Sequence, residues 1–172
     1  MRLQPVRRWP GLLWRRFSAP SALLLALTLV LASLPPPAAA QAPRIVAAQS
    51  GLFDPPGDAS ARFTPSRRLP LHDGQAFGWR LQLAPSSAQG EIRVRETLTL
   101  PAEPRTFGDP EPGLRRRTTP DGRSVISEYR LQAREGWIAN SWTVTRGDPP
   151  GRWRITVEVE GQPAQVFEFE AR

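Results

Sequence analysis

The amino-acid sequence predicts an all-β protein. Outside the N-terminal leader, proline and glycine residues punctuate the chain at short intervals, and between them lie short runs in which apolar and polar side chains alternate. Sheets covered by helices on both faces show continuous apolar runs instead. About seven to nine such short runs without a convincing helix are typical of an immunoglobulin-like antiparallel β-sandwich.

The first 40 residues differ from the rest and predict a secretory signal peptide. Five arginines precede the uncharged run Ser21–Leu34, and Pro35–Ala40 follows it. A basic region, a short apolar region and an Ala-x-Ala site are typical of a cleavable leader, and 14 apolar-region residues are fewer than the ~20 of a membrane-spanning helix. We expect cleavage after Ala40 and a periplasmic or secreted domain, residues 41–172, without a transmembrane helix. An uncleaved anchor is the alternative, and the export route stays open.

Most of the formal charge of +7 lies in this leader. Without its five arginines the chain keeps 18 basic and 16 acidic residues, a net charge of +2. This near balance argues against an electrostatic nucleic-acid binder, so no nucleic-acid partner is expected. Cysteine is absent, so packing rather than disulfides must hold an exported domain together.

The first half of residues 41–172 contains three predicted strands. Residues 44–53 form the first, although Ala47-Ala48 blurs its phase. Gly78–Leu83 is the second, with an inward face shared with Phe77. Glu91–Leu100 is the clearest, since alternate side chains of a strand point to opposite faces. The apolar residues expected to face inward in the last two strands are Phe77, Trp79, Leu81, Leu83, Ile92, Val94, Leu98 and Leu100.

Residues 124–133 alternate as a strand with Val125, Ser127, Tyr129 and Leu131 inward. Glu128–Glu135 also contains good helix formers, so a helix is the alternative. The preceding Thr119-Pro120-Asp121-Gly122 favours the strand, because Pro presets φ and Gly accepts a positive φ in a turn. Residues 114–118 would then be the hairpin partner.

The chain ends in a predicted hairpin. Its first strand places Trp153, Ile155, Val157 and Val159 on one face and polar residues on the other. Gly161-Gln162 forms the turn, and Phe167 and Phe169 return to the same core. The loop-like stretches are residues 54–58 and 101–112.

Five sequence features of this chain occur together. They are a strand that opens with Phe-Gly-Trp (Phe77–Trp79), a strand that ends in proline (Pro101), a Gly-Trp pair (Gly136-Trp137), a Pro-Gly-x-Trp strand (Pro150–Ile155) and a late phenylalanine (Phe167). The pattern resembles an uncharacterised family of short exported bacterial Ig-like domains, over most of residues 45–170. The resemblance implies this fold and export, and it implies no activity, because the family offers no catalytic residues to carry over.

No catalytic site is predicted. Cysteine and lysine are absent, which excludes thiol nucleophiles and lysine Schiff bases. His72, beside Asp73 in a turn, is expected to be a solvated loop residue rather than a general base. A pair of carboxylates could hydrolyse glycosides, but the glutamates of the predicted strands, such as Glu91, Glu158 and Glu160, lie on outward faces.

No metal or other cofactor is expected. One histidine without cysteine excludes the usual zinc ligand sets. Asp54 with Asp58, and Asp109 with Glu111, could each offer calcium two carboxylates, but acids are common in turns for capping reasons alone.

The arginines near the predicted Thr119–Gly122 turn are one candidate binding site. Arg115, Arg116, Arg117 and Arg123 would concentrate positive charge at one hairpin tip. Guanidinium groups match phosphate and carboxylate oxygens, so an anionic glycan or a lipid head group could bind there. The alternative is a solvated hairpin whose charges discourage edge-to-edge pairing.

Trp137 is the second candidate. With Trp142 it could form an exposed aromatic platform. Both are expected instead to be core residues flanking a bend, Trp142 more firmly because Val144 shares its phase.

Together these observations predict a non-catalytic exported binding or accessory module. The leading hypothesis is interaction with an unidentified protein partner in the bacterial envelope, through an edge strand or a hairpin loop. Recognition of an anionic glycan or lipid head group is the alternative, and a carboxylate-dependent hydrolase is a weaker one.

Overall fold

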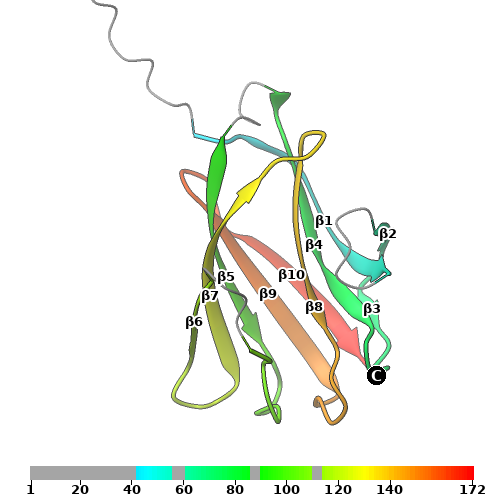
Figure 1. Cartoon of the computed structure of the whole chain (residues 1–172). Helices are drawn as coiled ribbons and strands as arrows, with labels where there is room; N and C mark the ends of the chain where they lie inside the picture. The colour runs from blue at the N-terminus through cyan, green and yellow to red at the C-terminus, as the bar shows by residue number, and fades with distance from the viewer. Residues whose placement is uncertain (1–41, 56–60, 86–89, 110–113) are drawn as a thin grey trace, which may run out of the picture. The chain divides into compact units, whose positions relative to one another are not determined.

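The computed structural model describes residues 42–55, 61–85, 90–109 and 114–172 (Figure 1). The predicted signal peptide lies outside these ranges. So do Asp58 and Glu111, which were members of the two candidate calcium pairs.

The described chain is built from strands, as predicted. They are β1 (Ile45–Asp54), β2 (Arg62–Pro65), β3 (Arg68–Leu69), β4 (Ala76–Leu83), β5 (Glu91–Thr99), β6 (Arg115–Thr118), β7 (Ser124–Gln132), β8 (Trp137–Thr143), β9 (Gly151–Val159) and β10 (Gln165–Ala171). These ten strands exceed the expected seven to nine because β2 and β3 have only four and two residues, too few to show alternation. None of the described segments forms a helix long and apolar enough to cross a membrane.

The strands form two sheets of unequal width. One has four strands in the order β2-β1-β4-β8, and the other has six in the order β3-β10-β9-β5-β7-β6. Neighbours are antiparallel except β3 and β10, which run parallel over two residue pairs. The predicted antiparallel sandwich is confirmed, with this short parallel pair as an addition.

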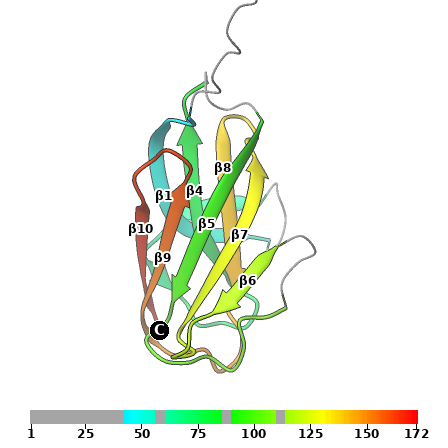
Figure 2. The same cartoon turned by 90° about the vertical axis from the view of Figure 1, so that its left-hand side faces the viewer.

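Contacts between the sheets show which strands lie opposite one another. The ring of Phe77 on β4 packs edge-on against Trp153 of β9 and Phe169 of β10, at centroid distances of 5.2 and 5.3 Å. Next along, β8 lies opposite β5, because Glu96 of β5 accepts a hydrogen bond from Asn140 of β8. β8 also reaches β6, because the ring centre of Trp142 lies 4.9 Å from the Arg116 guanidinium. Figure 2 shows β10, β9, β5, β7 and β6 from left to right, with β8 behind β5 and β7.

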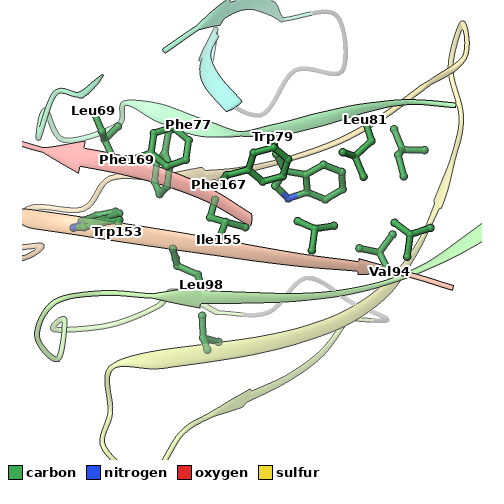
Figure 3. Close-up of a cluster of buried hydrophobic side chains, with 14 of the residues drawn as sticks. Leu69, Phe77, Trp79, Leu81, Val94, Leu98, Trp153, Ile155, Phe167 and Phe169 are labelled. Atoms are coloured by element: carbon green, nitrogen blue, oxygen red, sulfur yellow. The ribbon is translucent and has the colours of Figure 1, made fainter. Parts of the chain in front are cut away.

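The core fills the space between the sheets. Phe77, Trp79, Leu81, Trp153, Ile155, Phe167 and Phe169 all point into it (Figure 3). The apolar residues predicted to face inward on β4, β5 and β9 are buried, which confirms the period-two assignment. With no cysteine present, this packing provides most of the stabilisation.

Residues 124–133 form a strand, and the helical alternative is wrong. β7 pairs with β5 on one side and with β6 on the other. The turn between β6 and β7 is closed by the amide of Gly122 donating to the carbonyl of Thr119 at 2.9 Å, with Gly122 at φ 67°. A positive φ favours glycine, so the Pro-Asp-Gly turn determines this hairpin over the helix propensity of Glu128–Glu135.

Replacing Ile155 by alanine should lower the free energy of unfolding by about 2–5 kcal/mol, because it removes a fully buried side chain and leaves a cavity. Val166→Ala is the matched control, since Val166 is 57% exposed on the neighbouring strand. Its expected effect is within about 0.5 kcal/mol. Denaturant unfolding measures both, and equal effects would contradict the described core.

Candidate functional site

Glu96 is a fully buried carboxylate between the two sheets. It belongs to the inner face of β5, in phase with the buried Ile92, Val94 and Leu98. Sequence reasoning identified the apolar members of this face and missed Glu96. Its phase along β5 was the available indication, because every even-numbered residue of the strand points inward.

Three side chains donate hydrogen bonds to this carboxylate. The hydroxyl of Tyr129 on β7 and Nδ2 of Asn140 on β8 donate to Oε2, the latter at 2.8 Å. Nε1 of Trp142, also on β8, donates to Oε1. Only such pairing makes a buried carboxylate tolerable. These four residues, the Glu96 cluster, connect β5 and β7 of one sheet to β8 of the other.

Tyr129 remains a hydrogen-bond donor far into the alkaline range. Burial of its hydroxyl raises the pKa well above the ordinary value of 10.0, and the charge of Glu96 and the hydrogen bond to it raise the pKa further. Desolvation and a like charge both disfavour tyrosinate. The phenol therefore stays protonated and holds the ring of Tyr129 in place.

The strand register extends the polar character of this region across the wider sheet. Glu96 lies beside Ser127, and Ser127 lies beside Arg116, on the neighbouring strands β5, β7 and β6. Ser127 is 1% exposed, and its Oγ has no hydrogen-bond partner among the described residues. The Arg116 guanidinium lies 4.9 Å from the ring centre of Trp142, and Nη1 donates to the carbonyls of Phe107 and Gly108 at 3.1 Å.

A groove of about 1380 Å³ borders β8 and also extends along β5, β6, β7 and β9. Its lining includes Ser127, Tyr129, Arg116, Phe107 and, from β8, Asn140 to Thr143. Its volume exceeds the ~300–1,000 Å³ of most small-molecule pockets. Because the polar atoms of Tyr129 and Trp142 are directed toward Glu96, the carboxylate positions two of the aromatic side chains that line the groove.

The hydrogen-bonding direction of β8 shows which backbone groups face this groove. At its two ends the even-numbered residues bond to β4: Leu83 N–H donates to the Gly136 carbonyl, and Val144 N–H donates to the Gln75 carbonyl. Antiparallel strands alternate the direction of these groups, so odd-numbered residues direct theirs the other way. The backbone N–H and C=O of Trp137 are hydrogen-bonded to the C=O and N–H of Arg134 in an isolated bridge. The N–H and C=O groups on the open side are therefore those of Ala139, Ser141 and Thr143.

β8 also differs in composition from the other sheet edges. The edge strand β2 contains Arg62 and Pro65, β3 has two residues, and β6 is Arg-Arg-Arg-Thr. Short edges, charges and proline are the features that block unwanted strand pairing. β8 has seven residues without charge, proline or glycine, so it lacks all of these features.

The candidate arginines do not act as one group in the structure. Alternation along β6 directs Arg116 into the groove, while Arg115 and Arg117 are exposed. Arg123, just before β7, donates from Nε to the Leu100 carbonyl at 3.4 Å. Three consecutive arginines in a strand cannot share a face, and this alternation was readable in the sequence.

Trp137 is not a core residue, which corrects the prediction. It lies on the outer face of the four-stranded sheet, half-buried, with the Arg80 guanidinium 4.4 Å from its ring centre. The same guanidinium lies 4.1 Å from the ring of Phe63. One face of the indole is therefore covered by the chain itself. Trp142 faces inward in phase with the buried Val144, as predicted.

The described residues provide no metal cluster, and the carboxylate of Asp73 is engaged by Arg146. No group of three histidine, cysteine or acidic side chains among them could hold a metal ion. His72 is exposed, and the carboxylate of Asp73 accepts a hydrogen bond from the amide of Arg146 at 3.1 Å. Glu91, Glu158 and Glu160 are exposed, as predicted.

Comparison with known proteins agrees with the fold. The family model of the PM0630 beta sandwich domain matches residues 48–172. Among solved structures, an immunoglobulin-like protein (PA1606) from Pseudomonas aeruginosa is similar, with a TM-score of 0.51 and 19% sequence identity, over 78% of this chain and 99% of that one. At this identity the similarity shows the fold alone. No curated protein matched. The resemblance to an uncharacterised Ig-like family is confirmed.

Tyr129 is the single tyrosine of the chain, so ultraviolet absorbance of tyrosinate reports on it alone. In the folded protein we expect this absorbance to appear only well above pH 10.0. Below that pH both states keep the proton. Above it the unfolded chain loses its proton first, so the free energy of unfolding should fall as the pH rises. Tyr129→Phe should remove this part of the pH dependence. If Tyr129 of the folded protein ionised at the ordinary tyrosine pKa of 10.0, the result would contradict the buried hydrogen bond.

Replacing Glu96 by alanine should strongly destabilise the fold. It leaves three buried donors without their acceptor, and each unmet donor costs about 1–3 kcal/mol. We expect a loss of about 3 kcal/mol or more in the free energy of unfolding. Glu158→Ala is the matched control, because that glutamate is exposed on β9; its effect should be within about 0.5 kcal/mol. Similar effects for the two variants would show that the Glu96 cluster contributes little.

Proposed function

This chain belongs to the family of the PM0630 beta sandwich domain, and from its structure we propose that it is a non-catalytic exported module that binds a polypeptide partner by strand addition at β8. Strand addition means that an extended segment of the partner pairs with an open sheet edge. Export is proposed from the leader in residues 1–40. The partner would then be a protein of the bacterial envelope or of the secreted fraction.

The observation that carries the proposal is the open edge of β8 beside a groove. The backbone groups of Ala139, Ser141 and Thr143 face away from β4, toward a side where the described residues form no further strand, and β8 itself contains no charge or proline. Main-chain hydrogen bonds to such an edge provide affinity, and side-chain pockets beside it provide specificity. The small side chains of these three residues leave the backbone accessible.

The chemistry of the Glu96 cluster supports binding rather than catalysis. All three donors around Glu96 come from the chain itself, and Glu96 does not line the groove. A carboxylate engaged in this way holds its neighbours in place, as the supporting residues of a preorganised site do. Its role here is to fix Tyr129 and Trp142 where a partner would meet them.

A photo-crosslinking amino acid at Ala139 in the full-length chain, produced in its own host, should give one dominant adduct with an envelope or secreted protein. Ser141→Pro should reduce that adduct at least about tenfold, the effect of losing about 1.4 kcal/mol, because proline removes the N–H at the centre of the open edge. Proline is tolerated where the N–H points away from the sheet, so this variant should stay folded.

Ser141→Ala is the matched control for this experiment. It keeps the N–H and removes the hydroxyl, so the adduct should persist. A crosslinker at the exposed Val166 on β10 should give no such adduct. Equal adducts from Ala139 and Val166, or an adduct from Ala139 insensitive to Ser141→Pro, would exclude β8 as the binding edge.

A further inference from the structure

Resting on the proposed function, we infer that the strand that pairs with β8 carries an acidic side chain in the position beside Ala139, where its carboxylate binds the guanidinium of Arg80. The site lies on the outer face of the four-stranded sheet. Arg80, Trp137 and Ala139 do not line the groove, so the site is separate from it.

Arg80 is held in place on this outer face by three contacts. It projects outward from β4, because its neighbours along the strand are buried in the core. Its Nε donates a hydrogen bond to Oε1 of Gln49 on β1 at 2.7 Å. The guanidinium also lies 4.1 Å from the ring centre of Phe63 and 4.4 Å from that of Trp137, and such cation–π contacts are attractive. A side chain fixed in this way loses little conformational freedom when a ligand binds.

The positive charge of Arg80 is not compensated by the described residues. Its two Nη groups have no hydrogen-bond partner among them, and it takes part in none of their ion pairs. The one other charged residue of β1, β4 and β8 is Asp54, which lies about 17 Å along β1 from Gln49. By contrast, three exposed arginines of the wider sheet are each paired with a glutamate. Because interfaces match opposite charges, this guanidinium favours an anionic group on the partner.

The strand register places this guanidinium in line with the open edge. Arg80 lies beside Ala139 of β8, and side chains in register on neighbouring strands point to the same face of a sheet. The residue of an added strand beside Ala139 therefore continues this outward row. Ala139 is exposed and has only a methyl side chain, so it leaves the space between the two residues open. The contact with Trp137 shows that Arg80 already extends to β8.

The chemistry of the row favours a carboxylate on a long side chain. Carboxylates are the anionic side chains of a polypeptide at neutral pH, and their two oxygens match the two Nη groups of arginine. The α-carbon of the added residue would lie about 10 Å from that of Arg80, twice the spacing between neighbouring strands. Arg80 covers part of this distance. Glutamate covers the rest more easily than aspartate, because it is longer by one methylene group.

The test places a photo-crosslinking amino acid at Thr143 of the full-length chain, produced in its own host. Thr143 is exposed on β8, four residues from Ala139, so the row of Arg80 stays unchanged. Arg80→Gln should reduce the adduct with the partner at least about tenfold, because glutamine is polar but carries no charge. Arg154→Gln is the matched control, since Arg154 also faces outward from a strand but is paired with Glu168; its adduct should persist.

The crosslinked peptide of the partner, identified by mass spectrometry, should contain glutamate or aspartate four residues from the crosslinked one. Arg80→Glu should abolish the adduct, and replacing that acidic residue of the partner by arginine should restore it. Restoration separates a lost ion pair from a misfolded variant, because a partner mutation cannot refold this chain. A partner strand without an acidic residue at that position, or a failure of the charge exchange to restore the adduct, would overturn the inference.

Ser141→Pro separates this inference from the proposed function. If the adduct is lost in Ser141→Pro but kept in Arg80→Gln, strand addition stands and the acidic residue beside Ala139 is wrong. If the adduct is lost in Arg80→Gln but kept in Ser141→Pro, the partner does not pair with β8, and both proposals are wrong. They also both fail if neither Ala139 nor Thr143 gives an adduct.

Discussion

The arrangement of this domain near β8 depends on the burial of one carboxylate. Glu96 interrupts an otherwise apolar strand face, and its presence between two sheets requires donors from both. Tyr129, Asn140 and Trp142 supply them. The consequence is geometric as well as energetic, since Asn140 and Trp142 can reach this carboxylate only if β8 lies opposite β5.

Local sequence patterns predicted much of this fold. Period-two alternation identified the inner faces of β4, β5, β7 and β9 and the closing hairpin, because one-sided burial leaves its trace in every second residue. β2 and β3 are too short to leave such a trace. Pro-Asp-Gly correctly outweighed the helix propensity after Glu128. The widths of the sheets could not be predicted, because they follow from pairings between segments distant in the sequence.

The site was harder to predict than the fold, for reasons visible in particular residues. Glu96 was overlooked because its face was defined by apolar residues, although its phase placed it there. Arg115 to Arg117 were grouped by adjacency, whereas a strand separates neighbours onto opposite faces. Trp137 was expected in the core, although its odd position sets it apart from Trp142 and Val144. Only the juxtaposition of β8 with β6 and β7 required the three-dimensional structure.

The mismatch between four strands and six has a thermodynamic consequence. Among the described residues β8 is the last strand of the narrower sheet, and the wider sheet ends with β6, which Trp142 of β8 reaches through Arg116. A segment bound beside β8, as proposed, would contact the folded chain and not the unfolded one. Its binding free energy is therefore added to the stability of the fold, in proportion to the logarithm of its concentration once the groove is mostly filled. In this domain without disulfides, the free energy of unfolding would therefore rise as the groove is occupied, and either quantity could be measured to follow the other.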